Sequence, residues 1–487
     1  MAETLGNKQV TLLSLTSLRT ISKARVVCFL MGLTLMLLIM ASYNLTWDKT
    51  RLPFTTSPNQ VRPGVVQSNK AAAEVSSENN LIDMKQLVEI INSKLDYTPR
   101  KVPDEKDVIE MDPHLFSVIP RHFLPGVKSP CWYEEISSES STDPYRHSFY
   151  CHGSRCNNIK DKLPEYLQHR DGKLFRLRCL PYFYIVGQPK CGTTDLYSRL
   201  RRHPQVQYSM IKESKWWNRR RFGYILIEDG FKGIVPVEDY LDLFDKAAQH
   251  IQEEINRNSS GDHHMTQFIT VEASPSVMWN NIAWSYVHKE RKETEPGFLT
   301  QDFIHTLQPG AKIIMILRDP VERLYSHYLY SRRGKESRNE FHQMAIKSVR
   351  LFQSCLSKQS LRACAYKGSL FSAMPLKLNV GLYVVFLLDW LTVFHKDQIL
   401  VLRLEDYAAN MRATLRKAFD FLGLSPLSVE LEEEVMKQRV ANSRGVKDKK
   451  VGPMLPATRD LLREFHQPFN RKLASVLDHN GFLWSYP

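Results

Sequence analysis

Several features are scarce in this chain of 487 residues. No cysteines or histidines have the spacing of a structural zinc site, so we expect no structural metal. No internal repeat occurs, and no low-complexity segment interrupts the chain after about residue 114. Acidic residues are outnumbered, with 52 Asp and Glu against 66 Lys and Arg, which leaves a formal charge of +14. With 43% hydrophobic residues, the composition excludes disorder along the whole chain.

Long apolar runs are also missing, with one exception at residues 26–43. This run of eighteen residues contains no charge and roughly matches the ~30 Å core of a bilayer. Basic residues such as Lys23 and Arg25 precede it, which places residues 1–25 in the cytoplasm and the bulk of the chain in the lumen. The alternative is a cleaved signal peptide, but the run is longer than the usual apolar core and begins late. We therefore expect a single-pass type II signal-anchor.

The positive charge favours anionic partners: nucleic acid, an anionic membrane or an acidic polymer. A lumenal location argues against nucleic acid. Of the eight cysteines, Cys28 falls in the anchor, which leaves an odd number in an oxidising compartment. We expect Cys191 to be free and Cys355 to pair with Cys364. The pairing of the remaining four stays open: Cys131, Cys151, Cys156 and Cys179.

Residues 44–113 are polar and poor in aromatic side chains, which predicts a stem. Apolar residues at helical spacing between 81 and 95 predict one helix within it. That helix either docks on the body of the protein or pairs two stems in a homodimer. Residues 114–487 are expected to form a single lumenal domain.

Four short apolar runs in this domain have the pattern of central parallel strands, which are buried on both faces. Helical patterns at 380–393 and 424–439 separate or follow them. The fold class is therefore α/β, with a parallel sheet flanked by helices. Ligands of such sheets bind at the carboxyl ends of the strands. The predicted strands are residues 182–186, 268–271, 312–317 and 398–402.

The first strand runs into a glycine-rich turn at residues 187–194. Backbone N–H groups at such a turn, at the start of a helix, bind phosphate or sulfate. The glycine spacing equals that of a Walker A loop, but the lysine is displaced, which disfavours a kinase. A tight turn with no ligand is the alternative. The candidate ligands are Lys190, Cys191, Gly192, Thr193 and Thr194.

The third strand ends at Arg318, where a helix-start signal follows. Asp319 is the predicted N-cap, with Pro320 in the first turn and Glu322 completing a capping box. Arg318 and Ser326 are then available to an anion at the same sheet edge. A helix-end ion pair is the alternative role for Arg318. The predicted buried stripe of this helix is Val321, Leu324, Tyr325 and Tyr328.

Together these residues resemble the Golgi sulfotransferases that use 3′-phosphoadenosine 5′-phosphosulfate (PAPS). Residues 187–194 are similar to the 5′-phosphosulfate loop of that family, and residues 318–326 to its 3′-phosphate motif. The resemblance implies a sulfotransferase fold, PAPS as donor, no metal and the Golgi membrane. Segments 129–135, 299–305 and 381–383 narrow it to enzymes acting on chondroitin or dermatan sulfate. The implied acceptor is the C6 hydroxyl of N-acetylgalactosamine 4-sulfate.

The resemblance also implies that Glu213 is the base that takes the acceptor proton. Relatives carry Lys-Glu-Pro here, whereas this chain has Ser214 in place of the proline. Lys190 would stabilise the departing phosphate. A surface ion pair with Lys212 or Lys215 is the alternative role of Glu213.

Further residues are expected to contact the substrates. Trp216 and Trp217 either stack on a sugar or pack in the core. A basic loop near the C-terminus, with Arg444 and Lys447, is expected to close over the nucleotide, or else is a solvated charge run. The predicted acceptor-binding residues are Lys212, Trp216, Trp217, Arg220, Glu272 and Ser274.

Two functions rival sulfotransfer. One is a lumenal kinase, which would need ATP and a divalent metal. The other is a catalytically silent protein that binds glycosaminoglycans. The linear sequence does not reveal whether the three motifs meet in one site.

Overall fold

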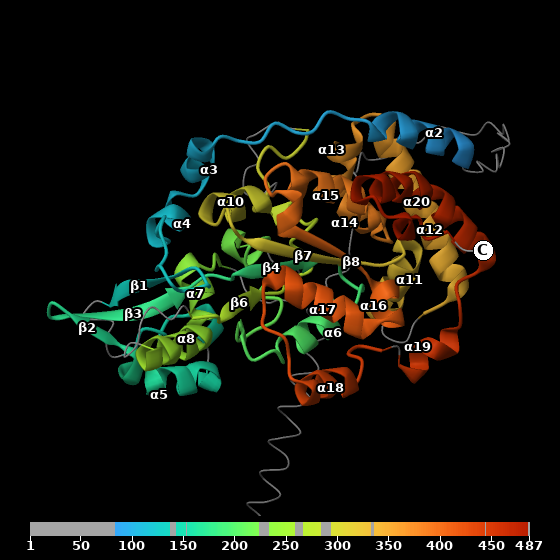
Figure 1. Cartoon of the computed structure of the whole chain (residues 1–487). Coiled ribbons are helices and arrows are strands. Elements are labelled where there is room, and N and C mark those ends of the chain that lie inside the picture. Colours follow the sequence, from blue (N-terminus) through green and yellow to red (C-terminus); the bar gives the residue numbers. More distant parts are fainter. Residues whose placement is uncertain are drawn as a thin grey trace, which may run out of the picture. The chain divides into compact units, whose positions relative to one another are not determined.

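The computed structural model describes residues 83–136, 143–151, 153–223, 233–258, 266–283, 294–332, 336–443 and 445–485. They belong to one compact unit, Asn80–Pro487, shown in Figure 1. The predicted tail, the anchor at 26–43 and most of the stem lie outside the described residues. Within the described ranges, no helix combines the length and apolar character that a membrane crossing requires.

A five-stranded parallel sheet forms the centre of the unit, in the order β5-β6-β4-β7-β8. The four predicted strands are confirmed as members of this sheet, to within one residue at each end. The prediction missed β5, because three residues give too short a pattern. The strands are β4 Phe183–Gly187, β5 Val206–Tyr208, β6 Ile269–Glu272, β7 Lys312–Leu317 and β8 Ile399–Arg403.

Both faces of this sheet are covered, which explains the consecutive apolar residues. Tyr184 and Met315 pack with the larger core on one face, and Ile185 and Ile314 pack with a second core on the other. Figure 1 shows α10, α15 and α20 on one side and α6 and α17 on the other. These helices are α6 Thr193–Leu200, α10 Thr300–Leu307, α15 Tyr383–Leu391, α17 Met411–Leu422 and α20 Pro456–Leu477.

A small antiparallel sheet, in the order β1-β3-β2, precedes the central one in the chain. Buried Arg178 ties it to the helices beside it, because its Nη1 atom lies 2.8 Å from Asp242 and 2.7 Å from Asp245. The elements of this region are β1 Cys131–Ile136, β2 Gln168–Arg170, β3 Lys173–Cys179, α5 Asn157–Tyr166, α7 Val237–Asp242 and α8 Asp245–Asn258.

The cysteine predictions are confirmed. Cys355 is bonded to Cys364, and Cys191 is buried and free. The pairing left open resolves into two more disulfides. Cys131 is bonded to Cys179, which joins β1 to β3, and Cys151 is bonded to Cys156.

The helix predicted between 81 and 95 is α2, Met84–Leu95, and it docks on the body against α20. Its apolar residues Leu87, Ile91 and Leu95 are buried there, so docking rather than stem pairing occupies this face. Two further helices follow, α3 Glu105–Met111 and α4 Pro113–Val118. The compact unit thus includes residues before the predicted boundary at 114.

The remaining helices lie in the C-terminal half. Predicted helix 424–439 is shorter in the structure, because Ser428 caps α18 by accepting the amide of Leu431. Predicted helix 380–393 likewise begins only at Tyr383, after the turn η4. These elements are α11 Pro320–Arg332, α12 Arg338–Leu356, α13 Leu361–Tyr366, α14 Gly368–Ala373, η4 Leu378–Gly381, η5 Lys396–Gln398, α16 Leu404–Ala409, α18 Val429–Lys437, α19 Val446–Val451 and η6 Asn480–Leu483; η1 Phe149–Cys151, η2 Gly153–Cys156 and η3 Arg220–Phe222 lie earlier.

Candidate active site

The glycine-rich turn connects β4 to α6, as predicted. Gly192 is the N-cap of α6 with φ +88°. This backbone conformation favours glycine, and a Cβ atom there would also have to displace Leu404 Cδ1, at 2.7 Å. The first amides of α6 therefore follow directly after a residue without a side chain. This arrangement suits a phosphate or sulfate group.

The side chains of this turn have different environments. The Lys190 ammonium lies 3.9 Å from the ring centroid of Tyr330, which is 67% exposed at the end of α11. Thr193 is buried and Thr194 is half-buried. Cys191 is buried with its Sγ 3.9 Å from the Tyr383 hydroxyl, and burial raises the pKa of its thiol to about 12. Cys191 can therefore contribute to an anion site through its backbone but not as a thiolate.

The second motif begins α11 as the sequence predicts. Asp319 Oδ1 accepts the Val321 amide at 2.8 Å, which confirms the N-cap. Arg318 lies 3.8 Å from Glu322 Oε2, so the alternative ion pair is present, although Glu322 also pairs with Arg459 at 2.7 Å. The Arg318 side chain remains 21% exposed. The predicted stripe is buried throughout: Val321, Leu324, Tyr325 and Tyr328.

These two motifs meet at one sheet edge. Gly187 of β4 pairs with Met315 of β7, and the Gln188 amide donates to Ile316 O at 2.9 Å. The Tyr383 hydroxyl donates to Arg318 O at 2.9 Å and reaches Cys191, so it bridges both motifs. The turn after β4 and the helix after β7 therefore lie side by side at the carboxyl ends of their strands.

The segment 212–217 joins the same edge through β6, the neighbour of β4. The Glu213 amide donates to Ala273 O at 3.0 Å, immediately after β6 ends. Glu213 has φ +64° and Lys215 has φ +54°. The Glu213 side chain is 41% exposed and pairs with Lys212, so the alternative ion pair is also seen. An exposed carboxylate at this edge can still accept a proton from a bound hydroxyl.

The structure corrects the role predicted for the two tryptophans. Trp216 and Trp217 are only 2% and 1% exposed, so neither presents a face to a sugar. Trp216 Nε1 donates to Val235 O at 2.8 Å, and Trp217 Nε1 donates to the Tyr240 hydroxyl at 2.9 Å. Trp216 also stacks on Tyr240 with ring centroids 4.5 Å apart. Both side chains, with their N–H groups hydrogen-bonded, therefore belong to the core, which was the alternative to stacking on a sugar.

Glu272 and Ser274 also require correction, because both are only 1% exposed and cannot line an acceptor pocket. Glu272 Oε1 accepts hydrogen bonds from Ser214 Oγ at 3.1 Å and Ser274 Oγ at 2.5 Å. Burial raises the pKa of Glu272 to about 7, although these hydrogen bonds act in the opposite direction. The two residues belong to the support of segment 212–217.

The three consecutive arginines after this segment are buried or half-buried. Arg219 and Arg221 are buried, and Arg221 pairs with Asp112 at 3.0 Å. Arg220 is half-buried; its Nε donates to Ser214 O at 3.2 Å. Its guanidinium lies 4.6 Å from the Phe149 ring centroid. Arg220 is the member of the three with access to a ligand.

The basic C-terminal loop is described in part. Arg444 and the side chain of Lys447 lie outside the described residues, while the backbone of Lys447 belongs to α19. The loop is tied to both motifs. Before it, the Ala441 amide donates to Asp195 of α6 at 2.8 Å; after it, Tyr325 of α11 donates to Gly452 O at 2.8 Å. The loop thus connects α6 with α11.

Sequence reasoning missed several residues that hold the site together. Asp195 accepts from Tyr407 at 2.6 Å and Arg199 at 2.8 Å in addition to Ala441. Glu405 accepts the Asp319 amide at 3.0 Å. The only sequence signal for Tyr383 was the resemblance of residues 381–383. The others gave none, because their partners are far away in the chain.

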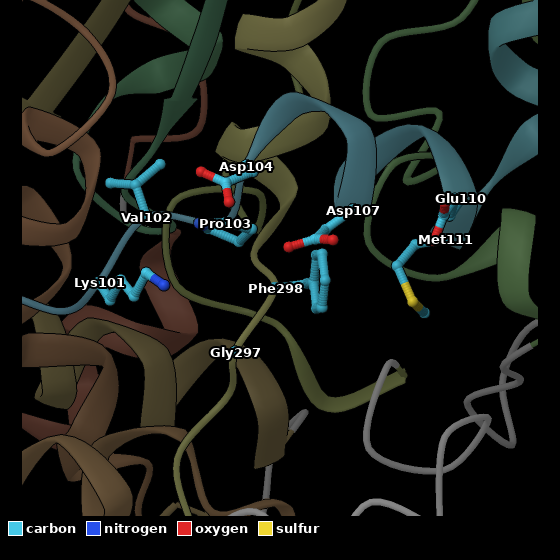
Figure 2. Close-up of a pocket in the computed structure, with 9 residues that line it drawn as sticks. All are labelled: Lys101, Val102, Pro103, Asp104, Asp107, Glu110, Met111, Gly297 and Phe298. Atoms are coloured by element: carbon cyan, nitrogen blue, oxygen red, sulfur yellow. The ribbon is translucent and has the colours of Figure 1, made fainter.

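A surface cavity of about 490 Å³ lies elsewhere, beside α3. Figure 2 shows the carboxylate of Asp107 beside the ring of Phe298. None of the residues that line it comes from the three motifs. Among the residues that the structure describes, no group of His, Cys, Asp and Glu could hold a metal ion. The cavity lining is Lys101, Val102, Pro103, Asp104, Asp107, Glu110, Met111, Gly297 and Phe298.

The chain is similar to several known proteins. The chain is 44% identical to carbohydrate sulfotransferase 15 of Homo sapiens over 510 aligned residues, covering 98% of this chain and 91% of the relative. The Mus musculus protein of that name gives the same figures. A sulfotransferase structure from Alicyclobacillus acidocaldarius aligns with a TM-score of 0.40 at 22% identity, covering 62% of this chain and 96% of that one. The family model described as "Sulfotransferase domain" matches residues 180–472. The chain therefore belongs to the sulfotransferase family, and it is a transferase enzyme.

Proposed function

We propose that this enzyme transfers the sulfuryl group of PAPS to the C6 hydroxyl of N-acetylgalactosamine 4-sulfate in chondroitin or dermatan sulfate. The observation that carries the proposal is the meeting of three segments at one edge of the central sheet. The turn with Lys190 follows β4, Arg318 follows β7, and Glu213 is bonded to the end of β6. The residues proposed to bind the phosphosulfate, to bind the second phosphate and to act as base are thereby adjacent.

The residues present fit the donor. The start of α6 and Lys190 offer amide donors and a positive charge to the 5′-phosphosulfate. The guanidinium of Arg318 and the hydroxyl of Ser326 offer donors to the 3′-phosphate. In the sequence, Arg444 and Lys447 fall between Ala441 and Gly452, and these two residues are bonded to the helices carrying the motifs. That location supports a role in covering the nucleotide.

In the proposed reaction, Glu213 takes the proton of the acceptor hydroxyl as the oxygen attacks sulfur. A new bond forms between that oxygen and sulfur, and the bond from sulfur to the bridging phosphate oxygen breaks. Lys190 leaves the Tyr330 ring and stabilises the negative charge that develops on that phosphate. A positioned base of this kind contributes about 10²- to 10⁴-fold to the rate. The ammonium does what a metal ion does in phosphoryl transfer, so no metal is required.

Several observations support a sulfated glycan as acceptor. The relatives at 44% identity are named carbohydrate sulfotransferases. The chain carries a formal charge of +14, which attracts an acidic polymer by long-range electrostatics. Lys212 and half-buried Arg220 lie beside the proposed base, where they can bind an acceptor sulfate or carboxylate.

We place the enzyme in the Golgi membrane as a single-pass type II protein, with its catalytic unit in the lumen. The uncharged run at 26–43 and the basic residues before it support this location. The three disulfides support it as well, because such bonds persist in the secretory pathway.

The test is to incubate the purified full chain with ³⁵S-labelled PAPS and defined chondroitin, dermatan and heparan chains, followed by disaccharide analysis. The expected product carries the label at C6 of 4-sulfated N-acetylgalactosamine. Label on heparan alone, or at another position, would contradict the proposed acceptor. Salt-dependent binding of chondroitin with no label transferred would instead favour the silent binding protein.

A further inference from the structure

Glu272 is a buried carboxylate that contacts the segment carrying the proposed base, Glu213. It ends β6, and its Oε1 atom accepts two serine hydroxyls, those of Ser214 and Ser274. Its other oxygen, Oε2, has no hydrogen-bond partner among the described residues. Burying a carboxylate costs free energy unless hydrogen bonds or an opposite charge compensate. A carboxylate buried with one oxygen unpaired therefore suggests a function beyond packing.

Each of the two serine hydroxyls also accepts a hydrogen bond from a backbone amide of segment 212–217. Ser274 Oγ donates to Glu272 and accepts the Lys215 amide at 3.1 Å. Ser214 Oγ donates to Glu272 and accepts the Trp216 amide at 3.3 Å. Glu272 thereby fixes the orientation of two hydroxyls, and the hydroxyls fix two consecutive amides.

The backbone held in this way is strained. Glu213 and Lys215 both have positive φ, at +64° and +54°, in a region that non-glycine residues seldom occupy. Such a conformation persists where the surrounding structure enforces it. The carbonyl oxygen of Ser214 also accepts hydrogen bonds from the Tyr150 hydroxyl and from Arg220 Nε, both at 3.2 Å. The segment is thus bonded on both sides of Ser214.

We propose that Glu272 is a positioning residue for Glu213. Through Ser214 and Ser274 it holds residues 213–216 in the conformation that presents the Glu213 carboxylate at the sheet edge. This inference rests on the proposed role of Glu213 as base. It also assigns Ser214 the task of fixing this turn by a side-chain hydrogen bond.

Titration of Glu272 provides a readout that a purely structural role would not give. Burial raises its pKa to about 7, and an ionised carboxylate accepts stronger hydrogen bonds than a neutral one. Activity is therefore expected to rise as the pH increases through about 7. The groups that face Glu272 electrostatically are Lys212 of the same segment, Tyr150 of η1, Tyr184 of β4, Tyr197 of α6 and Tyr240 of α7.

The experiment compares Glu272→Ala with Glu272→Gln in the full chain. Alanine removes the acceptor of both serines and is expected to lower kcat by about 10²-fold, the cost of a misplaced catalytic group, with the KM for PAPS unchanged. Glutamine keeps an acceptor oxygen but does not titrate. Its activity should stay near the level that the native protein shows below pH 7, above that of Glu272→Ala, and should lose the dependence on pH near 7. Unchanged kcat in Glu272→Ala, or an unchanged pH profile in Glu272→Gln, would overturn the proposal.

Matched serine and threonine variants separate positioning from general loss of stability. Ser214→Ala and Ser274→Ala should each lower kcat. Thr270→Val removes another buried hydroxyl of β6, bonded to Leu180 O at 2.6 Å, and should leave kcat unchanged for the folded protein. An equal loss of kcat in Thr270→Val would overturn the proposal.

A double variant distinguishes this inference from the proposed function. In a Glu213→Gln background, Glu272→Ala should lower kcat little further, because the group that it positions is gone. Full activity in Glu213→Gln alone would contradict the proposed base itself. An inactive Glu213→Gln combined with a fully active Glu272→Ala would overturn only the positioning role.

Discussion

The turn at 187–194 and the segment at 212–217 occupy the same sheet edge but are held there by different means. The turn depends on backbone: a glycine at φ +88° and the Gln188 amide bonded to Ile316 O. The segment depends on buried side chains, chiefly Ser214, Trp216 and Trp217. The conformation of the proposed donor-binding turn is thus set by residues of the turn and by backbone hydrogen bonds to the neighbouring strand. The acceptor side is carried by tertiary packing, so changes there affect both chemistry and stability.

The largest effect is expected at Glu213, the proposed base in that packed segment. Glu213→Gln should lower kcat by about 10²- to 10⁴-fold, because the acceptor hydroxyl loses its proton acceptor. The affinity for the desulfated nucleotide PAP, measured by calorimetry, should not change. Glu135→Gln is the control, since Glu135 of β1 is similarly exposed and pairs with Lys173 of β3. A normal kcat in Glu213→Gln would show that Glu213 is not the catalytic base.

The donor turn is expected to contribute almost as much through one side chain. Lys190→Ala should lower kcat by about 10²- to 10³-fold, because the departing phosphate loses a positive charge. Lys190→Arg should recover part of the rate. Steady-state assays of label transfer measure this, with Lys173→Ala as the control on an exposed pair. If Lys190→Ala matched the control, the turn would bind the donor through its backbone alone.

Trp217 tests whether the acceptor segment is core or sugar-binding surface. Trp217→Ala should destabilise the protein by about 3–5 kcal/mol, because a fully buried aromatic side chain is removed. Urea unfolding measures the change, and Trp217→Phe should cost less. Undiminished stability together with weaker acceptor binding would show that Trp217 contacts the sugar after all.

Arg318 offers a smaller effect confined to the donor. Arg318→Ala should weaken PAP binding by about 10- to 100-fold, the worth of a charged hydrogen bond of about 1.5–3 kcal/mol. Adenosine 5′-phosphosulfate lacks the 3′-phosphate and serves as the matched ligand. It should bind the variant and the parent protein alike. Equal weakening for both ligands would assign Arg318 to the helix end rather than to the 3′-phosphate.

The smallest effect concerns Cys191. Because burial raises the pKa of its thiol to about 12, the native protein should not be alkylated there at pH 8. Iodoacetamide labelling followed by peptide mass spectrometry measures this, and unfolding in urea should expose the site. Rapid native labelling of Cys191 would mean that the turn opens.

Most of the donor side was predictable because its signals are local. Strands at 182–186 and 312–317, the N-cap Asp319 and the positions of Lys190 and Arg318 all follow from short patterns. Each pattern reflects burial on both faces or a backbone requirement. Such features depend on a few consecutive residues, so the sequence alone predicts them.

The acceptor side was less predictable because its residues act on distant partners. Nothing near Glu272 in the sequence indicates that it holds Ser214, and of the two roles considered for Trp216 the structure shows packing in the core rather than acceptor binding. A carboxylate at a strand end is equally suited to a pocket or to a buried support. Only the packing around β6 decides between them.

The most direct test of one shared site is a single turnover of the full chain, in excess over ³⁵S-labelled PAPS, with chondroitin sulfate and a metal chelator present. The parent protein should transfer the label, whereas Glu213→Gln should bind PAP equally well and transfer almost none. Transfer that stops on chelation, or transfer that proceeds equally in Glu213→Gln, would contradict a metal-free site in which these three segments act together.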